Sequence, residues 1–411
     1  MKKLFIYQTF YTVAFLLGCT ACERSEYIES ANEAVPILFD QPLLTVETDS
    51  RSTLKDALSP GDAFGVLGYC VPYTVGTNTS SYNSASSRWE LKKAQCPPDV
   101  FYKQKVTVQS NGCIYNYEGE NTINNPKYWY RQEHDTNNEF NENVTADADN
   151  YKYSFIAYYP YEAVNGNYKN GEQPFVIDKP ADKATAGAPM LTFTMPQQGA
   201  GTTTEERENL RLNNELNHSI TPDAMLSVLY DHTKNEGNVR FNFRHVLTAL
   251  GVEINNFSDF DLTIHSLKLE GTFYKKVAID FTGSTVSWSM LPDRYSGYYS
   301  ILKSDLELPA PDAGQGQTVM QSPSPIGGEH IMLVSGAGIP FGEDVAIRIN
   351  YTFGASGPVE KVIYRPGTFI PQAGVKYITQ LNFVGDAFVL QFVVDNSESW
   401  EDGSDSDITF E

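Results

Sequence analysis

The stretch Tyr151–Tyr161, YKYSFIAYYPY, decides the fold class of this chain. In an extended backbone its large aromatic residues fall on both faces, which predicts a strand that is buried on at least one side. The whole sequence has this character, because 25 Tyr and 23 Phe are spread among short apolar runs that end at Gly, Pro, Asn, Ser or Thr. Such a composition is typical of many short strands joined by turns. We therefore expect an all-β protein.

Further apolar runs predict strands on both sides of this stretch. Two other segments look helical, namely the turn His245–Leu250 and the surface stretch Glu205–Asn214. Strands at this spacing, with turn signals between them, suggest β-sandwiches of the Greek-key type. The runs are Val35–Leu44 (VPILFDQPLL), Ala63–Val71, Val106–Val108, Leu191–Met195, Ala224–Tyr230, Val239–Phe243, Leu262–Leu269, Val277–Phe281, His330–Val334, Val345–Phe353, Lys376–Phe383 and Ala387–Val394.

The length of the chain predicts two domains. Its 411 residues are enough for two cores of ordinary size. The polar segment His232–Asn238 (HTKNEGN) separates two strand-rich halves, so we expect the boundary near residue 235.

The N-terminus predicts export. Lys2 and Lys3 precede an apolar run, Leu4–Leu17, that is typical of a secretory signal and too short for a stable membrane span. The residues Leu16-Leu17-Gly18-Cys19 resemble a bacterial lipobox, which would make Cys19 the acylated first residue of the mature chain. Several acyl chains would anchor it stably, since each buried methylene contributes about 0.8 kcal/mol. Cys22 is the weaker alternative acceptor, and an ordinary cleaved signal with an incidental cysteine is the other alternative.

The charge of the chain argues against one class of partner, and its cysteine count limits the possible disulfides. The chain has 30 basic and 51 acidic residues, a formal net charge of -21, which argues against nucleic acid because phosphate binding needs clustered Lys and Arg. Beyond the leader there are three cysteines, Cys70, Cys96 and Cys113. One disulfide with a free thiol, or no disulfide, fits this odd number, and Cys96–Cys113 is the pair to test.

Catalytic and metal-binding motifs are absent from the sequence. The six histidines show no zinc-helix spacing, and no nucleophile elbow, P-loop or dinucleotide fingerprint occurs, so we expect neither an enzyme nor a cofactor. Acidic clusters could bind a calcium ion, although solvent-exposed turns are the better interpretation of them. Aromatic residues could stack on sugars, although most should be core. The calcium candidates are Asp147, Asp149, Asn150, Glu401, Asp402, Asp405 and Asp407; the sugar candidates are Trp89, Trp129, Tyr295, Tyr298 and Tyr299.

The order of the segments resembles the fimbrillin family, the pilus subunits of Bacteroidales. The resemblance covers nearly the whole chain beyond Cys19. It rests on the lipobox, the strand Val35–Leu44, a loop with Arg51, and then GDAFGVLGY, SFIAYYPY, APMLTFTMP, VRFNFRHVLTALGVEI and GVKYITQLNFVGDAFVLQFVVDNSESWEDGSDSDITFE.

This resemblance implies a fold and a processing route. The fold would be two transthyretin-like β-sandwich domains in tandem. The precursor would reach the outer membrane as a lipoprotein carrying acyl chains such as palmitate, and an arginine-specific surface protease would cut it at the cell surface. Arg51 fits that cut better than Arg24 or Arg88 because it follows the first strand, and Ser52 would then begin the mature subunit. The implied segments are residues 1–18 (signal), 19–51 (lipidated propeptide with the first strand), 52–235 (N-terminal domain) and 236–411 (C-terminal domain).

Loss of the first strand would prepare the subunit for assembly. Unpaired backbone groups and uncovered apolar side chains would be left behind, and a strand from another subunit could satisfy both. The candidate donor is Ala387–Phe410, with Ile408 and Phe410 as anchors, although Ala387–Val394 alone is more simply an ordinary strand of the second sandwich. Head-to-tail contacts of this sort build a filament.

The implied protein is thus a non-enzymatic subunit of an adhesive fimbrium. Its partners would be other pilus subunits, the protease, and a host or bacterial surface ligand. The alternatives are a surface glycan-binding lipoprotein that keeps its anchor, and a surface glycoside hydrolase.

Overall fold

The computed structural model describes most of the strand-forming sequence. The chain divides into two units, 1–36 and 37–411, and every strand that the structure describes belongs to the second. The described residues are 35–44, 57–72, 98, 100–117, 126–129, 151–163, 168, 172–177, 190–196, 215–216, 220–281, 286–302, 304–311, 317–319, 330–335, 344–364 and 369–394.

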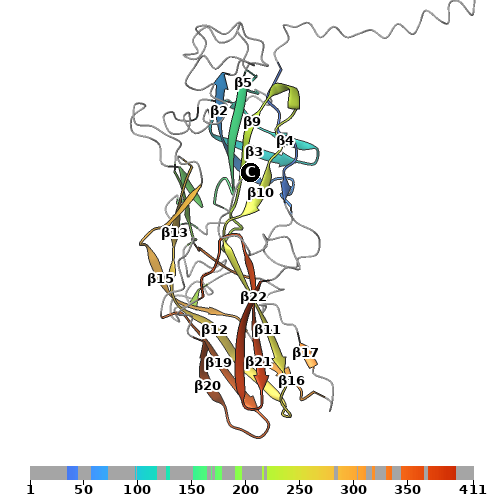
Figure 1. Ribbon diagram of the computed structural model, residues 1–411, viewed down its shortest axis with the longest axis vertical. Coiled ribbons are helices and arrows are strands. Elements are labelled where there is room, and N and C mark those ends of the chain that lie inside the picture. Colours follow the sequence, from blue (N-terminus) through green and yellow to red (C-terminus); the bar gives the residue numbers. More distant parts are fainter. Residues whose placement is uncertain are drawn as a thin grey trace, which may run out of the picture. The chain divides into compact units, whose positions relative to one another are not determined.

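A seven-stranded sheet contains the stretch that predicted the fold class (Figure 1). All neighbours in it run antiparallel except β1 and β10, which are parallel. Its order is β1 (Leu43–Leu44), β10 (Asn242–His245), β9 (Met225–His232), β5 (Tyr151–Tyr159), β2 (Ala63–Pro72), β3 (Phe101–Gln109) and β4 (Gly112–Ile114).

A four-stranded sheet shares a hydrophobic core with the seven-stranded one. Its strands come from distant parts of the chain, since β7 pairs with β13. The order is β14 (Ser287–Met290), β13 (Lys276–Asp280), β7 (Leu191–Thr194) and β6 (Phe175–Ile177). The shared core includes Leu67, Tyr69, Ile156, Tyr158, Leu226, Phe175, Phe193, Val277 and Ile279.

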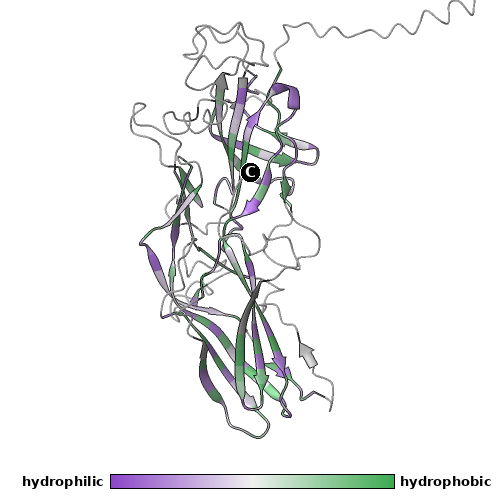
Figure 2. Cartoon of the chain, viewed as in Figure 1, coloured by the Kyte–Doolittle hydropathy of each residue, from purple (hydrophilic) through white to green (hydrophobic). Residues whose placement is uncertain are grey.

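Two further sheets enclose the second core. Strand β12 (Leu262–Tyr274) alternates buried and partly buried residues, as period-two patterning requires, and Figure 2 shows this alternation of hydrophobic and hydrophilic segments along the strands. One sheet has the order β20 (Val359–Tyr364), β19 (Ala346–Phe353), β12, β15 (Arg294–Ser300) and β8 (Glu215–Leu216), with β16 (Leu306–Leu308) on β12. The other has β17 (Gln317–Val319), β11 (Thr248–Asn256), β21 (Lys376–Val384) and β22 (Ala387–Val394), with β18 (Ile331–Leu333) on β11.

The prediction of an all-β fold is confirmed. The one turn of 3-10 helix among the described elements is η5 (Lys234–Glu236). The predicted helical turn at His245–Leu250 is wrong, because His245 ends β10, Thr248–Leu250 begin β11, and the buried residues Val246 and Leu247 only form a bend between the two strands. The stretch Glu205–Asn214 lies outside the described residues. Within the described ranges, no helix is long and apolar enough to cross a membrane.

The division into two domains stays a prediction. Strand β10 begins at Asn242 and pairs with β9, so the seven-stranded sheet continues beyond the expected boundary near residue 235.

Candidate functional site

The first strand segment, Ile37–Leu44, adds to β10 in parallel. Phe39 forms a bridge with Val239, and Leu43–Leu44 pair with Asn242 and Phe243. The backbone hydrogen bonds are short: the Val239 N–H donates to Leu38 O at 2.8 Å, the Asp40 N–H to Val239 O at 2.9 Å, and the Leu43 N–H to Phe241 O at 2.8 Å. We call Ile37–Leu44 the N-terminal segment.

The same segment is also bonded to the opposite end of the sheet. The Cys113 N–H of β4 donates to Phe39 O at 3.0 Å, and the Cys113 thiol donates to Asp40 O at 3.3 Å. Strands β10 and β4 stand near opposite ends of the strand order, yet both bond to this one segment. The sheet is therefore strongly curved. The N-terminal segment therefore closes the sheet. Its removal would uncover backbone groups on two strands at once.

A third set of contacts holds the beginning of the segment. The Ile37 N–H donates to Lys127 O at 2.7 Å, and the Tyr115 hydroxyl donates to Ile37 O at 2.7 Å. The Lys127 N–H donates in turn to the Tyr115 oxygen at 2.9 Å. Burial is the largest cause that raises the pKa of Tyr115 well above its ordinary value, so this hydroxyl keeps its proton and remains a donor.

Phe39 is the apolar anchor of the segment. Its side chain is 2% exposed and lies among four aromatic rings. Phe241 stacks on it at a centroid distance of 5.7 Å; Tyr115, Phe101 and Phe155 contact it at 5.3, 5.7 and 6.3 Å. These rings come from β3, β5, the residue before β10 and the loop after β4. We call the four rings the aromatic box.

Asp40 is the polar anchor of the segment. Its two carboxylate oxygens accept separate hydrogen bonds, from the Asn238 amide at 2.8 Å and from the Arg240 guanidinium at 2.9 Å. Both partners precede β10, in the chain that pairs with the segment. The contact thus fixes which residue of the segment faces which residue of its neighbour.

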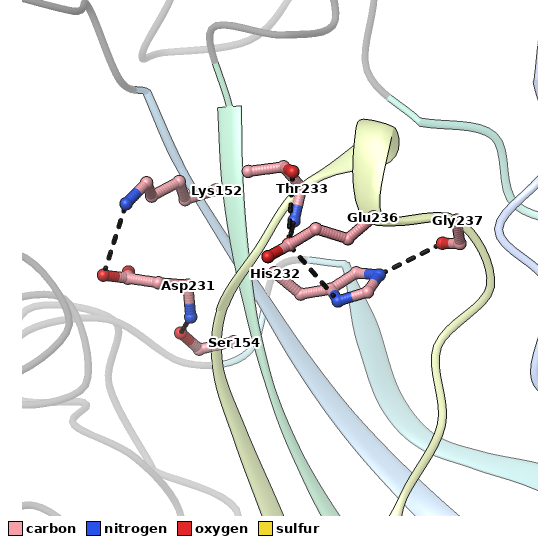
Figure 3. A network of polar contacts seen from close by, with 7 residues as sticks. All are labelled: Lys152, Ser154, Asp231, His232, Thr233, Glu236 and Gly237. Carbon is pink, nitrogen blue, oxygen red and sulfur yellow. Dashed lines mark hydrogen bonds and ion pairs between the residues drawn. The ribbon is translucent and has the colours of Figure 1, made fainter.

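The turn that leads into this neighbour is itself tightly bonded (Figure 3). The His232 ring contacts Gly237 O at 3.1 Å and the Glu236 carboxylate at 3.5 Å, and Glu236 caps the short helix η5 by accepting from Thr233. Asp231, at φ +53°, donates its N–H to Ser154 Oγ at 3.2 Å and pairs with Lys152 at 3.6 Å. These bonds fix the turn from which Asn238 and Arg240 extend.

The cysteine beside the segment is held as a neutral thiol. Desolvation by burial, and secondly the charge of Asp40, raise the pKa of Cys113 to about 12. Cys113 keeps a free thiol, so the Cys96–Cys113 pair is not formed, and Cys96 lies outside the described residues. The preceding Gly112 has φ +92°, a conformation that favours glycine, and it turns β3 back so that β4 reaches Phe39 O.

The predicted processing and donor residues lie outside the described residues. These are Cys19, Cys22, Arg24, Arg51, Ser52, Arg88, Ile408 and Phe410, together with Trp89 and the calcium candidates Asp147, Asp149, Asn150, Glu401, Asp402, Asp405 and Asp407. The described part of the chain has no group of three or more His, Cys, Asp or Glu placed to hold a metal ion. Strand β22 is an antiparallel partner of β21, as the simpler interpretation of Ala387–Val394 predicts.

The predicted sugar-stacking aromatics are mostly structural. Trp129 is only 3% exposed and contacts Tyr153 at 4.6 Å and His232 at 5.8 Å, so it supports the chain that carries Lys127. Tyr299 is fully buried in the second core and shares a hydroxyl contact of 2.7 Å with Tyr295. Tyr298 is partly exposed, and the Lys268 ammonium lies 4.3 Å from the centroid of its ring.

Sequence reasoning found the segment but missed the residues that hold it. Asn238 and Arg240 belong to the alternating run before β10, where Arg240 stands between the inward Val239 and Phe241. That alternation signals an outward arginine. The separation in sequence between Asp40 and Arg240 hides their contact.

Comparisons with known proteins identify what this arrangement is similar to. No family model matches the chain. The fimbrium subunit Fim1C of Phocaeicola vulgatus is 22% identical over 444 residues, which covers 100% of this chain and 99% of that protein. The crystal structure of a fimbrial protein from Bacteroides vulgatus superimposes with a TM-score of 0.52 at 18% identity, over 89% of this chain and 98% of that one, and so shares the fold. The predicted resemblance to fimbrial subunits of Bacteroidales is therefore confirmed along the whole chain.

Proposed function

We propose that this chain is a structural, non-enzymatic subunit of a cell-surface fimbrium that serves adhesion. It is exported as a lipoprotein through Cys19, cut after Arg51 by an arginine-specific protease, and assembled with other pilus subunits by exchange of the N-terminal segment for a donor strand. The full-length similarity to a fimbrium subunit supports the class of protein. The precursor belongs to the outer membrane, and the mature form to the fimbrium.

One observation carries the assembly step. The N-terminal segment closes a sheet by hydrogen bonds, and its covalent connection to that sheet runs through the residues after Leu44. It bonds to β10 on one side and to β4 on the other. A cut at Arg51, seven positions after Leu44, would leave no covalent link between the segment and the sheet. The sheet itself would stay connected, since β10 and β4 belong to the remaining chain.

We call the space that departure of the N-terminal segment would leave between β10 and β4 the groove. The energetics favour filling this groove with another strand over leaving it empty. Each lost backbone hydrogen bond costs about 1 kcal/mol net, and more where the partner stays buried. Uncovering the site of a buried phenylalanine costs about 3–5 kcal/mol. An empty groove is therefore strongly unfavourable, and a strand from another copy, added by β-augmentation, removes both costs. Because the donor and the groove are different surfaces, the contact repeats into a filament.

The experiment compares boiled and unheated surface extract on a denaturing gel. The proposal expects a ladder of multimers that collapses to one band on boiling, and a mature N-terminus at Ser52. Arg51→Ala should abolish both the cut and the ladder, while Arg88→Ala, a matched arginine elsewhere, should leave them. A single lipid-labelled band that begins at Cys19 would overturn the polymerising function and favour a permanently anchored lipoprotein.

A further inference from the structure

The contacts of the N-terminal segment define what a strand must carry to replace it. Ile37 is fully buried, Leu38 is 44% exposed, Phe39 fills the aromatic box, and Asp40 bonds with Asn238 and Arg240. The groove thus selects, in this order, an isoleucine-sized side chain, a residue that faces outward, an aromatic ring and a carboxylate.

The chain contains this pattern a second time. An isoleucine followed by any residue, a phenylalanine and an acid occurs at two places in the 411 residues. The first is Ile37–Asp40 (ILFD) and the second is Ile408–Glu411 (ITFE). The second occurrence lies in the acidic stretch of sequence that follows β22.

We propose that Ile408–Glu411 of a second copy of this chain occupies the positions of Ile37–Asp40, in the same direction and the same register. This rests on the strand exchange proposed above and adds its register. In this register, Asn238 and Arg240 bind the carboxylate of the incoming strand and so recognise it.

Each position of the second pattern suits its place in the groove. Ile408 matches Ile37, and Phe410 matches the ring held by the aromatic box. Thr409 would take the outward position of Leu38, where a polar side chain is better than an exposed leucine. Glu411 is one methylene longer than Asp40, and the 56% exposed Arg240 has room to adjust to it.

Parallel pairing follows from the order of the residues. The N-terminal segment runs parallel to β10, with Phe39 opposite Val239 and Leu43 opposite Asn242. A donor that runs the same way presents its apolar and acidic residues in the same sequence, whereas a reversed donor would place its acid before its aromatic ring. Backbone hydrogen bonds tolerate either direction, so the side chains decide it.

The test uses variants of the full chain that are processed at Arg51 and compared on unheated denaturing gels. Phe410→Ala should abolish the multimer ladder, since the ring is the main anchor. A double variant, Thr409→Phe with Phe410→Thr, keeps composition and charge but shifts the ring to the other face of the strand, and should abolish the ladder as well. Ser406→Ala, outside the four residues, should leave the ladder intact.

A charge exchange tests the polar contact separately. Glu411→Lys should weaken the ladder, and combining it with Arg240→Glu and Asp40→Lys, which reverses the acceptor and its resident partner together, should restore it. Restoration would follow only from a direct pairing of residues 411 and 240. A ladder that stays weak in this triple variant would overturn the assignment of Arg240.

Alkylation of Cys113 distinguishes a failure to dock from a failure to fold. Multimers of the parent protein should protect this thiol, because the donor covers it as Asp40 does now. Processed Phe410→Ala should give folded monomers, judged by an unchanged melting temperature before processing, in which Cys113 reacts. If the parent protein and the Phe410 variants both form a ladder, this inference is overturned and the proposed function stands. A parent without any ladder overturns both.

Discussion

The N-terminal segment and β22 each stand at the end of a strand order, but they are held in different ways. Strand β22 follows β21 through a tight turn at Gly385, and the two pair residue by residue from Val384–Ala387 to Tyr377–Val394. Its backbone pairing is local. The N-terminal segment bonds instead to residues far away in the sequence, on β10 and β4, and closes a sheet between them. A hairpin strand cannot leave its sheet after one cut elsewhere in the chain, whereas the N-terminal segment can.

The reactivity of Cys113 should give the largest contrast between the closed and the open sheet. A pKa raised from 9.0 to about 12 lowers the reactive thiolate fraction at pH 8 by roughly a thousandfold. Dissociation of the N-terminal segment should return the pKa toward 9.0 and raise the rate of alkylation accordingly, measured by mass spectrometry of the peptide that contains Cys113. Equal rates with and without the segment would contradict the closure.

The same thiol predicts how alkaline pH acts. Since the folded pKa lies above the ordinary value, its contribution to stability is complete below about pH 9 and is lost as the pH rises toward 12. Hydrogen exchange at the Val239 amide, which bonds to Leu38 O, should therefore accelerate beyond its intrinsic rate over this range. Cys113→Ser, which keeps a donor that does not titrate there, should remove the part of the excess that begins near pH 9, whereas Tyr115, whose buried hydroxyl also has a raised pKa, should keep the part that begins near pH 10.

Phe39→Ala should produce the largest loss of stability in the segment. The ring is buried against four others, so its removal leaves a cavity that costs about 3–5 kcal/mol of the free energy of unfolding. Leu38→Ala is the matched control, because Leu38 is the exposed neighbour and should cost less than about 1 kcal/mol. Denaturant unfolding followed by tryptophan fluorescence, to which Trp129 against Tyr153 of β5 contributes, measures both. Similar losses would show that the segment is not anchored by Phe39.

A substitution in the β21–β22 turn tests the other side of the comparison. Gly385 has φ +64°, and a methyl group added there would meet no atom within 4 Å beyond the adjacent residues, so Gly385→Ala introduces backbone strain and no clash. The expected cost is about 1–2 kcal/mol. It should lower the protection of β22 amides and leave the exchange of the Cys113 and Val239 amides unchanged. Loss of protection at both places would mean that the two strands are coupled.

The sequence predicted strands well where a short apolar run ends at turn residues. Such runs identified β5, β12 and β19, because the composition of a few neighbouring residues is local information. It misjudged His245–Leu250, whose residues suit a helix as well as a strand and are made extended by pairing with β18 and β21. It named Tyr295, Tyr298 and Tyr299 as sugar-stacking candidates but expected most such aromatic residues to be core, and Tyr299 of β15, which pairs with both β12 and β8, is indeed buried.

The groove was only partly predictable from the sequence, because it depends on contacts between residues that are far apart in the chain. The run VPILFDQPLL signals a strand by itself, and the family resemblance signals that it can detach. That Cys113 and Val239 meet on either side of Phe39 depends on the curvature of a seven-stranded sheet. No local pattern reports such curvature, and the polar contact between Asp40 and Arg240 follows from it.

The smallest expected effect concerns that polar contact. Asp40→Ala removes two hydrogen bonds, but the carboxylate is 31% and the guanidinium 56% exposed, so water screens the pair and the loss of stability should be about 0–1 kcal/mol. The effect should shrink further in 1 M salt, where the Debye length falls to about 3 Å. A loss as large as that of Phe39→Ala would mean that charge, and not the aromatic box, holds the segment. If the loss is small, Asp40 contributes mainly register: it selects which strand fits the groove and in which alignment, at little cost to the ease with which the strand leaves.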